Sequence, residues 1–158
     1  MSETLTEFGS IERELHIDAT PEVVFDVISR PDHIREWWGA ETGIEAVVGS
    51  TGELVWTSEE SGEQLVEAIS VVVADRPRRF AFRWISPDRA LPTPDNSLLV
   101  TFELTPSGSG TLLRVVESGF REMGWDAAVL EQAYHQHCDG WDTHLPLLAD
   151  VASAASPR

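Results

Sequence analysis

The middle of the chain contains five runs of β-branched and aromatic residues, separated by segments rich in Gly, Pro, Ser and Asp. The runs are Gly52–Thr57, Glu63–Ala74, Arg78–Ile85, Asn96–Thr105 and Gly110–Phe120. Runs of this kind bounded by turn formers are typical of β-strands. Because a parallel crossover needs a dozen or more residues, connections this short favour antiparallel pairing. The pattern therefore predicts an antiparallel meander.

The segments before this region predict one more strand and two short helices. Ser10–Asp18 alternates apolar and polar residues, as a strand with one buried face does. Thr20 followed by Pro21 supplies an N-cap and a first-turn proline for a helix. A second short helix is expected to start at Pro31 and to end at Gly39.

The C-terminal part predicts a long helix. Apolar positions recur every three or four residues, at Leu130, Tyr134, His137, Trp141, Leu145 and Leu148. Inside a helix Gly140 costs about 1 kcal/mol relative to alanine, and Pro146 costs about 3 kcal/mol. We therefore expect a kink near residues 142–146, or a break into two helices. Residues 10–153 are expected to form one domain between flexible ends, 1–9 and 154–158.

Charge and composition narrow the classes of partner. The chain has 27 acidic and 11 basic residues, for a net charge of −16, which disfavours nucleic acid. No apolar run is long enough to span a membrane, and the first ten residues do not resemble a secretory signal. The single cysteine, Cys138, excludes an internal disulfide framework. These features predict a cytoplasmic protein.

Several segments in order resemble one known family. IDATPEVVFDVISRPDHIREWWG (17–39) resembles the opening of the START-like (SRPBCC) superfamily, in the branch named after the activator of the heat-shock-protein-90 ATPase. VVVADRPRRFAFRW (71–84), the hairpin at 98–120 and the Gly140–Leu148 segment resemble the same branch. The resemblance covers residues 11–151 and implies an α+β helix-grip fold. In that fold a curved antiparallel sheet wraps around a long C-terminal helix, and two short helices follow the first strand.

The resemblance implies that a small hydrophobic or amphipathic molecule binds between the sheet and the long helix. A cyclase or hydrolase activity is an alternative, since relatives with this fold act on polyketide-like rings. No catalytic constellation and no cofactor motif is recognised, so binding is the preferred interpretation. Activation of a heat-shock ATPase is less favoured, because the proteins that gave the branch its name carry an additional N-terminal domain for which this chain has no room. The family also permits a homodimer.

Aromatic residues are the main candidates for a cavity wall. Neighbours on a helix point about 100° apart, so Trp37 and Trp38 do not face the core equally. One is expected to pack in the core and the other to line or cover the cavity mouth, the alternative being that both only fill space. Further candidates are Trp56, Phe82, Trp84, Phe102 and Trp141. They suit either a filled core or a hollow pocket.

Polar residues in inward-facing phases are the remaining candidates. Arg13 and Glu117 lie in the apolar phases of the first and last strands, which are neighbours in the implied fold. We expect them to meet as a buried ion pair or to hold a polar ligand group, unless a bulge turns Arg13 outward. His137 and Tyr134 belong to the helical stripe, where packing, a hydrogen bond in the core or a contact in the cavity are all open. The YHQHC spacing matches no common metal motif, so no metal site is expected.

The proline-containing segment 86–97 is a further candidate, because it could restrict a pocket entrance. A stiff connection between two strands is the alternative.

Overall fold

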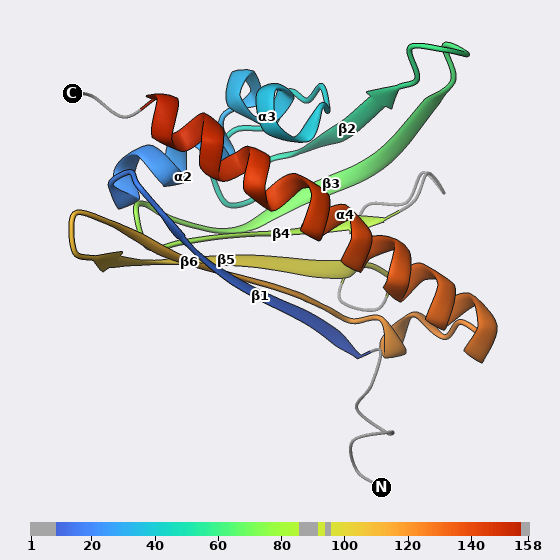
Figure 1. Ribbon diagram of the computed structural model, residues 1–158. Helices are drawn as coiled ribbons and strands as arrows, with labels where there is room; N and C mark the ends of the chain where they lie inside the picture. The colour runs from blue at the N-terminus through green and yellow to red at the C-terminus, as the bar shows by residue number, and fades with distance from the viewer. Residues whose placement is uncertain (1–8, 86–91, 94–95, 156–158) are drawn as a thin grey trace, which may run out of the picture.

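Six antiparallel strands form one curved sheet in the order β1-β6-β5-β4-β3-β2 (Figure 1). The computed structural model describes residues 9–85, 92–93 and 96–155. The strands are β1 (Ser10–Ile17), β2 (Thr51–Thr57), β3 (Gln64–Asp75), β4 (Arg79–Ile85), β5 (Leu98–Ser107) and β6 (Gly110–Ser118). The helices are α2 (Pro21–Ser29), α3 (Pro31–Trp38), the 3-10 turn η1 (Arg121–Met123) and α4 (Ala127–Ala155).

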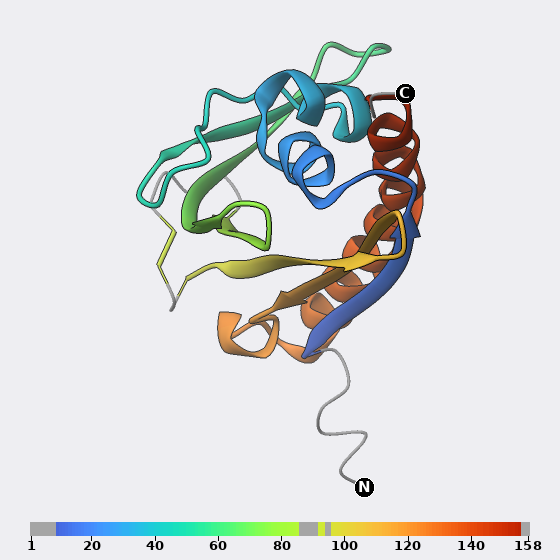
Figure 2. The ribbon, with the colours of Figure 1, turned by 90° about the vertical axis from the view of Figure 1, so that its left-hand side faces the viewer.

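The connections explain this strand order. Strands β2 to β6 follow one another as a meander, whereas α2 and α3 separate β1 from β2 and let β1 pair with β6. Figure 2 shows the sheet curling around the interior, with α4 lying along its concave side and α2 and α3 closing the opening. The expected helix-grip fold is therefore confirmed, including the pairing of the first and last strands.

Local signals place the two short helices. The Thr20 hydroxyl accepts a hydrogen bond from the backbone N–H of Val23 (3.3 Å), which caps α2. Gly39 follows α3 with φ +74°, the left-handed conformation that glycine adopts without strain. Its N–H donates to the carbonyl of Arg35 (3.1 Å). Both helix boundaries agree with the sequence prediction.

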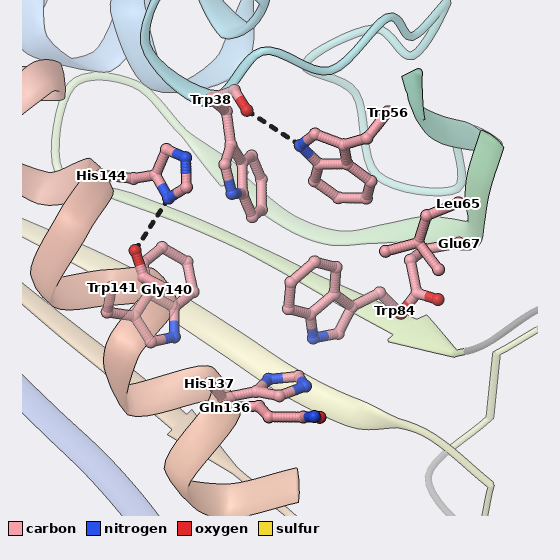
Figure 3. A pocket seen from close by; sticks show the side chains of 10 residues that line it. All are labelled: Trp38, Trp56, Leu65, Glu67, Trp84, Gln136, His137, Gly140, Trp141 and His144. Atoms are coloured by element: carbon pink, nitrogen blue, oxygen red, sulfur yellow. Dashed lines mark hydrogen bonds between the residues drawn. The ribbon is translucent and has the colours of Figure 1, made fainter. Parts of the chain in front are cut away.

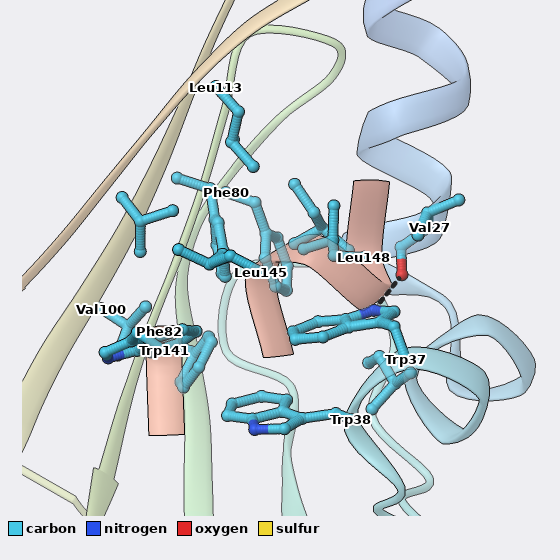
Figure 4. Packing of buried hydrophobic residues seen from close by; sticks show 14 of the residues in the cluster. Val27, Trp37, Trp38, Phe80, Phe82, Val100, Leu113, Trp141, Leu145 and Leu148 are labelled. Carbon is cyan, nitrogen blue, oxygen red and sulfur yellow. Dashed lines mark hydrogen bonds between the residues drawn. The ribbon is translucent and has the colours of Figure 1, made fainter. Parts of the chain in front are cut away.

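Apolar residues from the sheet and from all three α-helices form one buried core. Alternate residues of β4, β5 and β6 face this core, among them Phe82, Val100 and Leu113. Figure 4 shows Leu145 and Leu148 of α4 in the same cluster. Fully burying a leucine side chain contributes about 1.5–3 kcal/mol, so these contacts fix α4 across the sheet.

Helix α4 is one continuous element, so of the two predicted alternatives, a kink near residues 142–146 or a break into two helices, the break is wrong. The side chain of Pro146 is exposed, whereas its neighbours Leu145 and Leu148 are buried. The burial of these two leucines offsets the cost of the proline. The helix also includes Ala154 and Ala155, which were expected to belong to a flexible end.

Several predictions concern residues that the structure does not describe. Residues 1–8, 156–158 and most of the 86–97 segment lie outside the described residues. In the described part of the chain, no helix is both long enough and apolar enough to cross a membrane.

Candidate functional site

An open pocket of about 300 Å³ lies between α4 and the β2–β4 side of the sheet (Figure 3). Tryptophans dominate its wall, and they come from α3, β2, β4 and α4. The lining residues are Trp38, Trp56, Leu65, Glu67, Trp84, Gln136, His137, Gly140, Trp141 and His144. With Leu65 and Glu67 from β3, five separate elements therefore meet at this site.

The two adjacent tryptophans of α3 have different surroundings. Trp37 is 1% exposed, and its indole N–H donates to the carbonyl of Val27 (2.9 Å), as Figure 4 shows. Trp38 is 8% exposed and lines the pocket. The two rings stack with centroids 4.9 Å apart and planes 8° apart. Trp37 therefore supports Trp38 from the core side.

Trp38 is the centre of an aromatic group that we call the tryptophan wall: Trp38, Trp56, Trp84 and Trp141. The ring centroids of Trp56, Trp84 and Trp141 lie 5.5, 5.2 and 5.5 Å from that of Trp38. The indole N–H of Trp56 donates to the carbonyl of Trp38 (2.8 Å), which joins β2 to the end of α3. Ring contacts and hydrogen bonds together hold the wall in place.

Glu117 of β6 lies behind this wall and is fully buried. Its carboxylate accepts hydrogen bonds from the indole N–H groups of Trp84 and Trp141, each at 2.8 Å. The Nδ1 atom of His137 lies 2.9 Å from both carboxylate oxygens. Because a carboxylate only accepts, Nδ1 carries a proton. Three donors therefore compensate the buried charge, as burial of a carboxylate requires.

His137 connects this buried network to the pocket that it lines. Burial lowers the pKa of His137, but the hydrogen bond to Glu117 and the negative charges of Glu117 and Glu67 outweigh it. The net result is a pKa above the ordinary value for histidine. Since Nδ1 is held by Glu117, Nε2 is the nitrogen that remains to meet a molecule in the pocket.

The prediction that Arg13 and Glu117 meet is wrong. In the β1–β6 register Arg13 lies opposite Val115, and Ile11 lies opposite Glu117. The guanidinium instead bonds Asp142 on α4, with Nε to Oδ1 at 2.7 Å and Nη2 to Oδ2 at 3.3 Å. The hydrogen bond from Arg13 lowers the pKa of Asp142 below its usual range. A long side chain on the concave face reaches the helix before it reaches the neighbouring strand.

The other sequence candidates divide between pocket and core. Trp38, Trp56, Trp84, His137 and Trp141 line the pocket together. Phe82 and Phe102 are 2% and 0% exposed and belong to the core. Tyr134 lies outside the lining, where its hydroxyl donates to the carbonyl of Ser10 (2.8 Å).

Sequence reasoning missed Leu65, Glu67, Gln136, Gly140 and His144. The sequence pattern could have indicated Glu67, because it lies on the same inward face of β3 as the buried Ile69 and Val71. Among the described residues, no group of three or more His, Cys, Asp or Glu side chains is arranged to hold a metal ion.

Comparisons with known proteins identify related sequences and folds. The family model described as "Activator of Hsp90 ATPase homolog 1-like protein" matches residues 18–153. A comparison with curated proteins gives no match.

Solved structures similar to this chain come from several bacteria. A protein of Mesorhizobium loti is 24% identical with a TM-score of 0.72, covering 94% of this chain and 99% of that one. One from Arthrobacter aurescens is 17% identical with a TM-score of 0.76, covering 96% and 90%. One from Rhodobacter sphaeroides is 19% identical with a TM-score of 0.72, covering 95% of each chain. At these identities the likeness shows the fold alone.

Proposed function

The chain belongs to the family of activator of Hsp90 ATPase homolog 1-like proteins, and on this premise we propose that it binds a small apolar or amphipathic molecule in the tryptophan-walled pocket. The observation that carries the proposal is the wall itself, in which Trp38, Trp56, Trp84 and Trp141 line one pocket. Pockets for small molecules are typically concave, largely apolar and supplied with a few polar groups. Here Glu67, Gln136 and the two histidines are those polar groups.

Hydrogen bonds within the protein hold the wall side chains in place, which favours binding. Trp56 donates to the carbonyl of Trp38, and Trp84 and Trp141 donate to Glu117. Side chains that are already fixed lose little conformational entropy on binding, whereas each mobile side chain would cost about 0.5–1.5 kcal/mol. A ring that enters the pocket gains about 25 cal/mol for each Å² of apolar surface removed from water.

Indole N–H signals in ¹⁵N-resolved NMR spectra provide the test. The chain has six tryptophans, of which four form the wall. Titration with small neutral ring-bearing alcohols, such as benzyl alcohol, should give saturable shifts of the four wall signals. Trp37 and Trp125 do not line the pocket and serve as internal controls. Equal shifts at all six signals, or none, would contradict the proposal.

Gly140 allows the pocket to be filled by mutation. It lies on the pocket lining, and a Cβ added to it would meet nothing within 4 Å. Gly140→Leu should therefore occupy the pocket, retain the helix and abolish the saturable shifts. Gln132→Leu is the matched control, since Gln132 lies exposed on the same helix outside the lining. Undiminished binding by Gly140→Leu would place the ligand elsewhere.

Acid–base chemistry is a second candidate function, favoured by the bond between His137 Nδ1 and Glu117. A carboxylate behind an imidazole fixes its tautomer and raises its basicity, which suits a general base. A ketone such as phenylacetone would then exchange its α-protons for deuterium faster in D2O with the protein than without it. His137→Gln should abolish the acceleration, and His135→Gln, at an exposed position, should not. The same rate with His137→Gln would exclude this role.

A further inference from the structure

We infer that the pocket selects ligands whose apolar ring carries a hydroxyl group, such as a small aromatic alcohol. The inference rests on the proposed function and specifies the chemical class of ligand. It is drawn from two polar atoms of residues that line the pocket. The indole N–H of Trp38 is a hydrogen-bond donor, and Nε2 of His144 is an acceptor when the imidazole is neutral.

Trp38 supplies a donor that the protein does not use. The indole N–H groups of the other three wall residues have acceptors: the carbonyl of Trp38 for Trp56, and Glu117 for Trp84 and Trp141. The N–H of Trp38 has no acceptor among the residues that the structure describes. Trp38 is 8% exposed, and its N–H is not sealed off from solvent. A ligand that displaces water from this N–H loses affinity unless it supplies an acceptor in its place.

His144 supplies the acceptor. Its Nδ1 atom lies 2.8 Å from the carbonyl oxygen of Gly140. Because a carbonyl oxygen only accepts, Nδ1 carries the proton, and in the neutral ring Nε2 has the free lone pair. A Cβ added to Gly140 would meet nothing within 4 Å, so there is space for a ligand beside this turn of α4. The tautomer of His144 is therefore fixed by the helix, with its acceptor left for a ligand.

The two residues occupy the same end of the pocket. Figure 3 shows Trp38 and His144 at the end where α3 meets α4, with the nitrogen of Trp38 on the ring edge toward α4. His137 lies two turns earlier on α4, about 10 Å along the helix axis, and marks the other end. A ring against the tryptophan wall would therefore carry its polar group at the Trp38 end.

A hydroxyl group is the smallest neutral group that satisfies both atoms. It accepts from the N–H of Trp38 and donates to Nε2 of His144, whereas an ether or ketone oxygen only accepts. A hydrocarbon does neither and would leave the donor and the acceptor without partners, which costs affinity. The pocket should therefore discriminate among ligands of equal size by their hydrogen-bonding groups.

Three probes with the same number of non-hydrogen atoms test the inference: benzyl alcohol, anisole and ethylbenzene. The first donates and accepts, the second only accepts, and the third does neither. Spectra are recorded at about pH 8, where an imidazole in water is neutral. The indole proton signal of Trp38 should move downfield with benzyl alcohol and anisole but not with ethylbenzene. The ¹⁵N signal of His144 Nε2 should move upfield with benzyl alcohol alone.

Substitution of Trp38 identifies the donor. Trp38→Phe keeps an aromatic ring and removes the N–H, so it should weaken benzyl alcohol binding about fivefold more than ethylbenzene binding. Trp56→Phe is the matched control, because the N–H of Trp56 already donates to a carbonyl of the protein. It should change the affinities for all three probes by the same factor, which separates loss of ring surface from loss of a hydrogen bond.

Substitution of His144 identifies the acceptor. The asparagine amide in His144→Asn can still donate to the carbonyl of Gly140, but it has no atom at the position of Nε2. Binding of benzyl alcohol should weaken about fivefold, whereas binding of anisole should stay unchanged. His135→Asn, at an exposed position of the same helix outside the lining, should alter neither affinity.

The outcomes separate the inference from the proposed function. If Trp38→Phe weakens all three probes equally, or the Trp38 signal does not move downfield with benzyl alcohol, hydroxyl recognition is refuted and the binding pocket stands. If His144→Asn leaves the affinity for benzyl alcohol unchanged, the inference also fails. If no probe shifts the wall signals, both the inference and the proposed function are refuted.

Discussion

Replacement of Glu117 by glutamine tests the buried network on which the wall depends. Glutamine has the same shape as glutamate but offers one carbonyl oxygen in place of two carboxylate oxygens. Trp141 donates to Oε1 and Trp84 to Oε2, so one of the two indole N–H groups would face an amide NH2 group. The charge that attracts His137 also disappears.

The expected loss of stability follows from these contacts. A buried donor without an acceptor costs about 1–3 kcal/mol. The remaining hydrogen bonds change from charged to neutral, which costs about 1 kcal/mol more. We therefore expect Glu117→Gln to lower the free energy of unfolding by about 2–4 kcal/mol, which leaves a domain of ordinary stability folded.

Urea denaturation near neutral pH, followed by circular dichroism, measures this loss. With a denaturant dependence of about 2 kcal/mol per molar urea, the midpoint should fall by about 1–2 M. Glu103→Gln is the matched control, because Glu103 pairs with Arg114 on a half-exposed surface. Surface pairs contribute about 0–1 kcal/mol, so its midpoint should change little. Equal midpoints for the two variants would refute the assignment of Glu117 as a charge that the fold depends on.

Three further predictions concern α4. Because the pKa of His137 is raised in the folded state, its contribution to stability is fully present below pH about 6.5 and is lost as the pH rises through the folded-state pKa. The stability difference between the native protein and His137→Gln should therefore be larger at acid than at alkaline pH, and a flat difference in urea midpoints would contradict this. Asp142→Asn breaks a half-exposed pair with Arg13 and should cost less than about 1 kcal/mol, diminishing with added salt. The contribution of Asp142 to the free energy of unfolding is present above pH about 4 and is lost as the pH falls through its lowered pKa. The difference in unfolding free energy between the native protein and Asp142→Asn, measured as a function of pH, should therefore decrease in acid. Pro146→Ala restores a backbone donor at an exposed site and should raise the unfolding free energy by about 1–3 kcal/mol, whereas a lower melting temperature would show that the helix is adapted to the proline.

Local signals in the sequence were sufficient to predict most of the fold. Thr20 capped the first helix and Gly39 ended the second, because each acts on its own backbone. The alternation in β1 and β6 correctly placed Glu117 on the inner face. The sequence left open whether α4 continues through Pro146 or breaks there, because its continuity depends on burial of leucines against a sheet that is distant in the sequence.

The pocket was harder to predict than the fold. Small differences in packing decide whether an aromatic residue lies in the core or lines the pocket, as Trp37 and Trp38 illustrate. Arg13 pairs with Asp142 because its long side chain extends to α4. The pairing of the strands alone does not predict this contact. Glu67 could have been predicted as a site residue, since a carboxylate on the inward face of a strand is seldom buried without a specific role.

The tryptophan wall also acts as one optical unit. Trp38 lies within 5.5 Å of the ring centroids of Trp37, Trp56, Trp84 and Trp141, at interplanar angles from 8° to 79°. At such separations the excited states of the rings are shared, so light absorbed by one indole is emitted or quenched through its neighbours. Far-ultraviolet circular dichroism of this protein should therefore contain an aromatic band that distorts helix estimates. If a bound molecule quenches the fluorescence of one wall residue, the fluorescence of the whole wall should decrease.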